Sequence, residues 1–339
     1  MKQLALSKLN ELFAAMAAQQ QLYIPADNGG QAQFLPYVDG MELTKSLNTA
    51  RSAKDLFFPQ TEDIVGFQVK GTEITIEETR DPGAPFVVFG VRACDARSFD
   101  ILDRVFLSDP VDTFYETRRA NGIVVTLACT HPEETCFCGA FGIDPANPGG
   151  DVAAWMAGET LYLRANTEKG EKLLSSLPLL SDCDDNAVKT VQAEIHAITE
   201  KLPLNKLDLT GFDGDHLMEH FNNPAWSKLS ESCLGCGTCT FVCPTCQCYD
   251  VRDFDTGHGV RRFRCWDSCM YSDFTMMAHG TNRPTQKERF RQRFMHKLVY
   301  FPSNNDGIYG CVGCGRCLAK CPISMNIVKV AKTLGEGTK

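Results

Sequence analysis

One cysteine pattern occurs twice toward the C-terminal end of this chain of 339 residues. Both copies read C-x-x-C-x-x-C-x-x-x-C-P, and each has two glycines between its first three cysteines: Cys233, Cys236, Cys239 and Cys243 in the first, and Cys311, Cys314, Cys317 and Cys321 in the second. This is the spacing with which bacterial ferredoxins hold [4Fe–4S] clusters. Structural zinc fits poorly, because it usually uses two C-x-x-C pairs separated by a longer segment.

In two-cluster ferredoxins, the fourth cysteine of each run binds the cluster of the other run. The sequence therefore predicts one cluster on Cys233, Cys236, Cys239 and Cys321, and a second on Cys311, Cys314, Cys317 and Cys243. The exchange ties together two segments separated by residues 244–310, so this region should depend on its metal for folding. The alternative is that the clusters only stabilise the fold, although two adjacent clusters also form a path for electrons.

The N-terminal half has the pattern of an α/β domain with a partly parallel sheet. Residues 85–91 and 122–127 are short apolar runs, as expected of strands buried on both faces. Residues 97–107 between them have helical spacing, which predicts a parallel strand–helix–strand unit. Further strands are expected at 74–76 and 161–163, and further helices at 113–120, 169–177 and 187–202.

The chain begins with apolar residues at helical spacing, namely Leu4, Leu9, Leu12, Phe13 and Met16, which predict a surface amphipathic helix. A segment rich in proline, glycine, asparagine and aspartate, 203–225, marks a domain boundary. We therefore expect an α/β domain at 1–205, a linker at 206–225, and a mostly helical, ferredoxin-like two-cluster domain with a large insertion at 226–339.

Four cysteines of the N-terminal half form a second candidate set: Cys94, Cys129, Cys136 and Cys138. Cys94 follows one predicted strand and Cys129 the next, and in a parallel sheet both lie at the carboxyl edge, where binding sites are usually found. The loop from 129 to 139 could bring three thiolates to one point. A third iron–sulfur cluster, a zinc ion and buried unliganded thiols are all compatible with this pattern.

Four further cysteines, Cys246, Cys248, Cys265 and Cys269, lie within the insertion. Their spacing matches no established motif. They could hold a further cluster, form a redox-active or substrate-facing thiol group, or be structural.

The insertion also contains a strongly signalled helix. Thr285 and Glu288 form a capping box at its start. Phe290, Phe294 and Leu298 form its apolar stripe, whereas its cationic residues are Arg289, Arg291, Arg293 and Lys297. We expect these cations on a solvated face, with an acidic partner surface as the alternative. Beside iron–sulfur clusters they would also raise the reduction potential.

Charge and motifs exclude several classes of function. The net charge of −8 argues against general nucleic-acid binding, and no apolar stretch is long enough for a transmembrane helix. No P-loop and no G-x-G-x-x-G after a strand is present, so the sequence gives no evidence that this chain binds its own NAD or flavin. Seventeen cysteines without a secretion signal predict reduced thiols or metal ligands in the cytoplasm.

The chain resembles the iron–sulfur beta subunit of cytoplasmic NAD(P)-linked [NiFe] hydrogenases of the sulfhydrogenase type, and it is similar to the iron–sulfur subunit of anaerobic sulfite reductase. The resemblance rests on FFPQTE (57–62), GVRACDARSFDILDRVFL (90–107), CTHPEETCFCG (129–139), CLGCGTCTFVCPTCQCYDV (233–251), CWDSCM (265–270), KERFRQRFMHK (287–297) and GCVGCGRCLAKCP (310–322). It implies that Cys94, Cys129, Cys136 and Cys138 belong to a recurring set, which favours a third cluster. It also implies that Cys246, Cys248 and Cys269 are not incidental.

These observations predict an electron-transfer subunit of an anaerobic, cytoplasmic oxidoreductase complex. By resemblance, it relays single electrons between a flavoprotein subunit that binds NAD(P)H and a catalytic subunit or ferredoxin, in a complex of the hydrogenase, sulfite reductase or electron-bifurcating type. The alternative is a catalytic subunit in which the N-terminal cysteine site meets a substrate.

Overall fold

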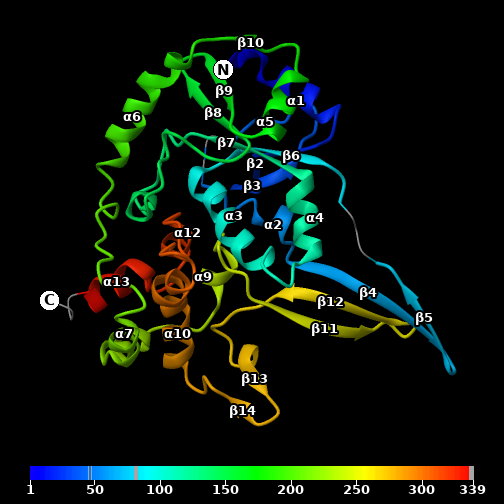
Figure 1. The fold of residues 1–339 in the computed structure, drawn as a ribbon, viewed down its shortest axis with the longest axis vertical. Coiled ribbons are helices and arrows are strands. Elements are labelled where there is room, and N and C mark those ends of the chain that lie inside the picture. Colours follow the sequence, from blue (N-terminus) through cyan, green and yellow to red (C-terminus); the bar gives the residue numbers. More distant parts are fainter. Residues whose placement is uncertain (45, 47, 80–82, 336–339) are drawn as a thin grey trace.

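The computed structural model describes the chain except for residues 45, 47, 80–82 and 336–339. Its main element is an eight-stranded sheet with the order β10-β1-β9-β8-β7-β6-β2-β3 (Figure 1). The four central strands run parallel to one another, and they are β2 (Gln21–Asn28), β6 (Phe86–Val91), β7 (Gly122–Leu127) and β8 (Val152–Ala157). The flanking strands are antiparallel, and they are β3 (Gln31–Pro36), β9 (Thr160–Ala165), β1 (Lys2–Ala5) and β10 (Ser181–Asp182). The predicted partly parallel α/β fold is thus confirmed.

Helices cover both faces of this sheet, which explains why β6 and β7 are continuous apolar runs. On one face, α1 (Leu9–Ala17) and α5 (Glu168–Ser175) pack against Val87 and Phe89 of β6. On the other face, α2 (Lys54–Phe57), α3 (Ala93–Phe106) and α4 (Thr113–Asn121) pack around Val88. The predicted helices and strands of this half are confirmed, including α6 (Lys189–Thr199).

The prediction of a surface helix that includes Leu4 was wrong. Leu4 lies in strand β1, and the helix begins only at Leu9. Leu12, Phe13 and Met16 are completely buried in the core between α1 and the sheet. The helical spacing of the later residues is real, but the strand before them pairs with β9, a contact too distant in sequence for local periodicity to show.

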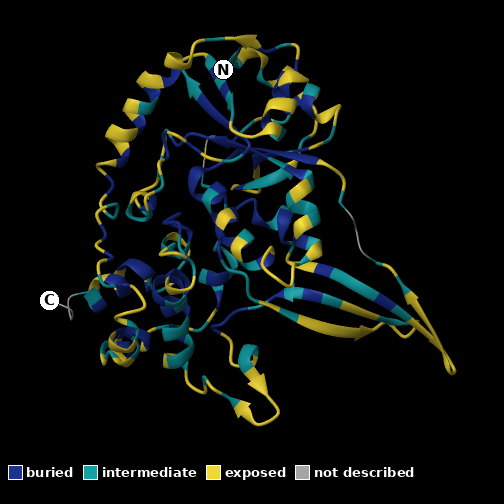
Figure 2. Ribbon diagram, in the orientation of Figure 1, coloured by how far each residue is buried: buried dark blue, intermediate teal, exposed yellow. Residues whose placement is uncertain are grey.

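A second, four-stranded antiparallel sheet joins the two halves of the chain. Its order is β11 (Tyr249–Asp255), β12 (Val260–Trp266), β4 (Thr61–Lys70) and β5 (Glu73–Glu77). The pairing of β12 with β4 places the insertion against the N-terminal half. This sheet extends away from the main body (Figure 1), and the end formed by β4 and β5 is largely exposed (Figure 2).

The C-terminal region is built from short helices around an apolar core that includes Trp226, Phe290, Phe294 and Val330. The helices are α7 (Leu217–Asn222), α8 (Ala225–Ser230), α9 (Thr238–Phe241), α10 (Gln286–Met295), α11 (Phe301–Ser303), α12 (Arg316–Ala319) and α13 (Ile327–Gly335), with a π-helical turn at His296–Tyr300 and a small hairpin of β13 (Met276–Met277) and β14 (Gly280–Thr281). Phe212, from the predicted linker, is buried in this core. The division at 206–225 remains a prediction.

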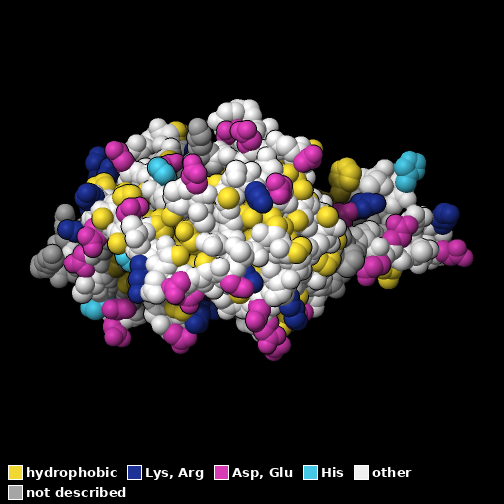
Figure 3. Space-filling view, turned by 90° about the horizontal axis from the view of Figure 1, so that it is seen from above, with side chains coloured by type: hydrophobic (Ala, Val, Ile, Leu, Met, Phe, Trp, Pro, Cys, Tyr) yellow, Lys and Arg dark blue, Asp and Glu magenta, His cyan; other side chains and the backbone are white. Residues whose placement is uncertain are grey.

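Acidic side chains are spread over the face shown in Figure 3, in keeping with the net charge of −8. Among the described helices, none is long and apolar enough to cross a membrane.

Candidate metal centres

The first predicted set of four cysteines surrounds one cavity. Cys233, Cys236 and Cys239 of the first run and Cys321 of the second line about 430 Å³ of space free of protein atoms, which we call the first cavity. Gly237 has a φ of 73°, and a Cβ there would lie 2.5 Å from the hydroxyl oxygen of Tyr271. Only glycine therefore allows the loop to curl at this position.

The second predicted set surrounds a neighbouring space, the second cavity, of about 340 Å³. Its lining includes Cys311, Cys314 and Cys317 of the second run and Cys243 of the first. The structure thus brings together both sets with the exchanged fourth cysteine. Within the described residues, no three His, Cys, Asp or Glu side chains converge as the ligands of a single metal ion would. Four thiols around a mainly apolar cavity instead fit a [4Fe–4S] cluster, whose ligands surround four iron atoms.

Two buried cations lie beside these cavities, and this corrects the expectation of a solvated cationic face. Arg293 is 3% exposed and lines both cavities, and Lys297 is 5% exposed and lines the second. The Lys297 ammonium donates to Thr245 Oγ1 at 2.8 Å and to the carbonyl oxygen of Gly310 at 3.0 Å. The predicted capping box of Thr285 and Glu288 is present. Helical periodicity identified the polar residues, but it could not show that cysteine loops cover them.

The electrostatics of Arg293 point to an anionic neighbour. Burial disfavours its charged form, yet the negative charges that Cys239 and Cys317 carry when they are ionised, as metal ligands are, raise its pKa above the usual value. Its Nε atom is buried without a hydrogen-bond partner among the described residues. Buried donors are normally satisfied, so an orphaned one beside eight thiols fits an anionic iron–sulfur centre.

The N-terminal cysteine set, Cys94, Cys129, Cys136 and Cys138, is also gathered in one place. Cys94 lies in the first turn of α3 after β6, and the others lie in the loop after β7, as the parallel pairing of these strands requires. All four are buried, with exposures of 8% or less. Burial raises the pKa of Cys138 to about 12. Thiols in so dry a site would ionise only with a cationic partner or a metal.

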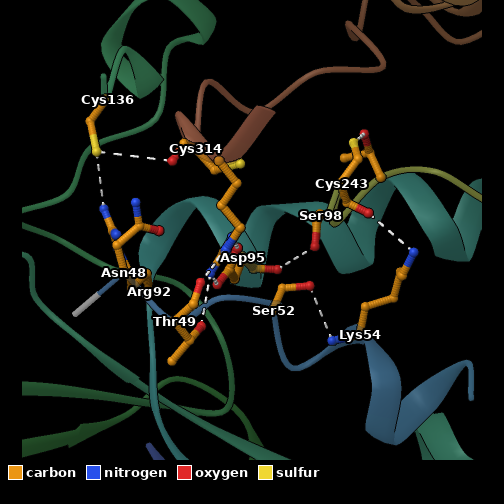
Figure 4. Close-up of polar contacts among 12 residues, drawn as sticks. Asn48, Thr49, Ser52, Lys54, Arg92, Asp95, Ser98, Cys136, Cys243 and Cys314 are labelled. Carbon is orange, nitrogen blue, oxygen red and sulfur yellow. Dashed lines mark hydrogen bonds and ion pairs between the residues drawn. The ribbon is translucent and has the colours of Figure 1, made fainter. Parts of the chain in front are cut away.

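Arg92 supplies the cationic partner of this set. Its Nη2 atom donates to the sulfur of Cys136 at 3.3 Å (Figure 4). The same atom donates to the sulfur of Cys129 at 3.7 Å. Its Nε and Nη1 atoms are buried without partners among the described residues. Arg92 was not predicted from the sequence, although a charged residue directly after an apolar strand and two positions before a cysteine is a signal that could have indicated it.

The N-terminal cysteine set touches the second cavity. The amide of Phe137 donates to the carbonyl oxygen of Gly313 at 2.9 Å, and the sulfur of Cys136 lies 4.0 Å from the carbonyl oxygen of Cys314. Arg316, inside the second cysteine run, forms a bidentate ion pair with Asp95, next to Cys94, at 2.5 and 2.6 Å. This pair was not predicted from the sequence.

The remaining four cysteines do not form one group. Cys246 is in side-chain contact with Cys243, and Cys248 with Cys269. Cys265 lies within β12 opposite Asp250 of β11, and the charged residues that act on it are Arg252, Asp250 and Asp267. Its neighbour Trp266 points to the opposite face of β12 and is buried, as the alternation of a strand requires.

Another buried cation supports the segment that holds Cys243 and Cys246. The ammonium of Lys54 donates to the carbonyl oxygens of Cys243 at 3.1 Å and Cys246 at 3.0 Å. It also lies 3.5 Å from the ring centre of Trp266, a cation–π contact. Burial lowers the pKa of Lys54 to about 8. This role of Lys54 could not be predicted from the sequence, because its partners are main-chain atoms almost 200 positions away.

Comparison with known proteins places the chain in a family. Residues 232–325 match the model of the 4Fe-4S dicluster domain. The chain is 36% identical to the sulfhydrogenase 2 subunit beta of Pyrococcus furiosus over 286 aligned residues. The aligned region covers 83% of this chain and 82% of that protein. No solved structure matches the chain. The predicted resemblance is thereby confirmed, and the chain belongs to the family of iron–sulfur beta subunits of the sulfhydrogenase type.

Proposed function

We propose that this chain relays single electrons through three [4Fe–4S] clusters. The first is held by Cys233, Cys236, Cys239 and Cys321, the second by Cys311, Cys314, Cys317 and Cys243, and the third by Cys94, Cys129, Cys136 and Cys138. Clusters bound in these sets accept and release one electron at a time. The observation that carries the proposal is the contiguity of the three sets. Arg293 lines the first and second cavities, and Phe137 hydrogen-bonds to the loop of the second.

Burial supports a relay more than substrate chemistry at the N-terminal cysteine set. Cys136 is 1% exposed and Cys94 is 3% exposed, so a soluble substrate has no access to their sulfur atoms. By contrast, Cys236 of the first set is the exposed residue among the seventeen cysteines, all of which lie in the described part of the chain. The first cavity is therefore the end of the relay nearest to solvent, where a partner could exchange electrons.

We further propose that the partners are a flavoprotein subunit that binds NAD(P)H and a catalytic subunit or ferredoxin, assembled in the cytoplasm of an anaerobic cell. Two facts support this. The chain has no P-loop and no dinucleotide-binding fingerprint, and the relative in Pyrococcus furiosus is named as one subunit of a sulfhydrogenase. A flavin converts the two-electron chemistry of NAD(P)H into the single electrons that iron–sulfur clusters carry.

The test is a stepwise reductive titration of anaerobically prepared protein, followed by electron paramagnetic resonance. We expect signals from interacting clusters, with one component lost in Cys138→Ala and the others retained. The same protein should not reduce a viologen dye with NADH until the flavoprotein partner is added. Enzyme-like dye reduction by the chain alone would overturn the proposal, as would a Cys138→Ala variant that retains every signal.

A further inference from the structure

A surface cleft beside the second cavity has two cysteines in its wall. Cys248, immediately before β11, and Cys269, after β12, both line it, together with the aromatic residues Phe106 and Tyr249 and the basic residue Arg283. The side chains of Cys248 and Cys269 are within hydrogen-bond contact of each other. The amide of Asp267 donates to the carbonyl oxygen of Cys248 at 3.0 Å, which fixes the two segments side by side. Two thiols thus meet at a position that a small molecule can reach.

The same two thiols lie close to the proposed electron path. Cys246, two residues before Cys248, is in contact with Cys243, which lines the second cavity. The charges of Lys297 and Arg293 act on Cys269, and that of Lys297 also acts on Cys248. The contact with Cys269 lowers the pKa of Cys248 to about 7, and Lys297 acts in the same direction, so Cys248 is the residue that ionises to the reactive thiolate. The contact with Cys248 and burial raise the pKa of Cys269, so Cys269 keeps its proton until the first step has occurred.

We propose that Cys248 and Cys269 form a redox-active dithiol that reduces the disulfide bond of a small organic molecule bound in this cleft. This dithiol proposal rests on the proposed electron relay in one respect only, because the relay supplies the single electrons that reduce the dithiol again. Cys248 is the more accessible of the two, since Cys269 is 8% exposed. Cys248 is therefore the attacking residue and Cys269 the resolving residue.

The Cys248 thiolate attacks one sulfur of the substrate, forming a mixed disulfide and releasing the first substrate thiolate, which takes up a proton. The Cys269 thiolate then attacks Cys248, so that the second substrate thiol leaves and a Cys248–Cys269 disulfide remains. Two electrons, delivered singly by a low-potential one-electron donor, and two protons return this disulfide to the dithiol.

A fourth iron–sulfur cluster explains the arrangement less well. It would need four ligands around one cavity, but Cys246 turns toward Cys243 and Cys265 lies among Arg252, Asp250 and Asp267. Among the described residues, only two cysteines line the cleft. Cys265 is therefore a matched control for the substitution of Cys248 or Cys269, because it lies on the same hairpin but takes no part in the contact between these two residues.

The experiment uses the full chain with its clusters, prepared without oxygen, with oxidised glutathione as the probe. The protein is reduced with dithionite, desalted and mixed with the probe, and free glutathione is counted. Alkylation and mass spectrometry then map the cysteines. We expect a Cys248–Cys269 disulfide in the wild type and in Cys265→Ser, and none in Cys248→Ser. Cys269→Ser should accumulate glutathione on Cys248.

Iron content and paramagnetic spectra of the same samples separate the two proposals. If these show intact clusters but no disulfide forms and no glutathione is trapped on Cys248, the dithiol proposal fails while the relay stands. If Cys248→Ser and Cys269→Ser each lose the iron of one cluster, the residues are metal ligands and the dithiol proposal is also overturned. If the wild type lacks clusters but still forms the disulfide, the relay fails and the dithiol remains.

Discussion

Phe137 and Gly313 are joined main chain to main chain, although they come from opposite halves of the chain. The amide of Phe137 donates to the carbonyl oxygen of Gly313 at 2.9 Å. A Cβ atom on Gly313 would lie 2.4 Å from the carbonyl oxygen of Phe137. The absence of a side chain at Gly313 thus lets the loop of the second cavity pack directly against the loop that carries Cys136 and Cys138.

Gly313→Ala should disrupt two metal sites at once. The new methyl group would collide with main-chain atoms, which cannot move aside as a flexible side chain can, and residue 313 has a φ of 60°. We expect loss of iron from both the second cavity and the N-terminal cysteine set. Gly307→Ala is the control, because Gly307 has a φ of 76° but open space around it. Gly307→Ala should lower the free energy of unfolding by roughly 1–2 kcal/mol, because of the left-handed backbone conformation, and leave the iron content unchanged.

Arg293→Gln should lower the reduction potentials of both the first and the second cluster. Reduction adds negative charge beside a buried cation that lines both cavities, so removing the cation disfavours the reduced forms. The interaction between a cation and an added electron at short range in a protein amounts to a few kcal/mol. This corresponds to a change in reduction potential on the order of 100 mV for a one-electron couple.

Potentiometric titration followed by paramagnetic resonance measures this shift. Arg293→Lys should restore most of the potential. Lys287→Gln removes one charge from an exposed position of the same helix and should change little. Equal shifts in Arg293→Gln and Lys287→Gln would show that only the overall charge matters and would contradict the assignment.

The Arg316–Asp95 pair should stabilise the contact between the second cysteine run and α3. Both side chains are 2% exposed or less, and Arg316 also donates to the carbonyl oxygen of Thr49 at 2.8 Å. Because Asp95→Asn removes the carboxylate that pairs with the buried Arg316 charge, we expect the free energy of unfolding to fall by about 3–5 kcal/mol. The measurement is the denaturant midpoint of the anaerobic protein, followed by cluster absorbance.

The exposed pair of Arg104 and Asp306, with its 2.9 Å contact, provides the comparison. Asp306→Asn should lower the free energy of unfolding by about 1 kcal/mol or less, because ion pairs on the surface contribute little to stability. If the two substitutions shifted the midpoint equally, the buried pair would have no special role in holding the halves together.

Local signals in the sequence predicted local features well. The capping box at Thr285 and the strands at 86–91 and 122–127 depend on neighbouring residues and on periodicity, and the structure has them. The fixed spacing of the two cysteine runs also sufficed to pair Cys243 with the second cavity and Cys321 with the first.

Contacts between distant segments could not be predicted in this way. The burial of Arg293 depends on which loops fold over α10, and the pairing of β12 with β4 joins segments nearly 200 residues apart. Likewise, Cys265 lies within β12 opposite Asp250, whereas Cys269 follows the strand and lines a cleft with Cys248, although closeness in sequence had grouped Cys265 and Cys269 together. Arg92 was overlooked because its partners, Cys129 and Cys136, lie in a different loop.

The central claim, that three cysteine sets hold three clusters, is tested most directly by counting iron and acid-labile sulfide per chain in anaerobically prepared protein. The account predicts about twelve iron atoms in the wild type, about eight in Cys136→Ala, and about twelve in the control Cys183→Ala, since each cubane contains four. About eight iron atoms in the wild type, unchanged in Cys136→Ala, would contradict it and leave Cys94, Cys129, Cys136 and Cys138 without a cluster.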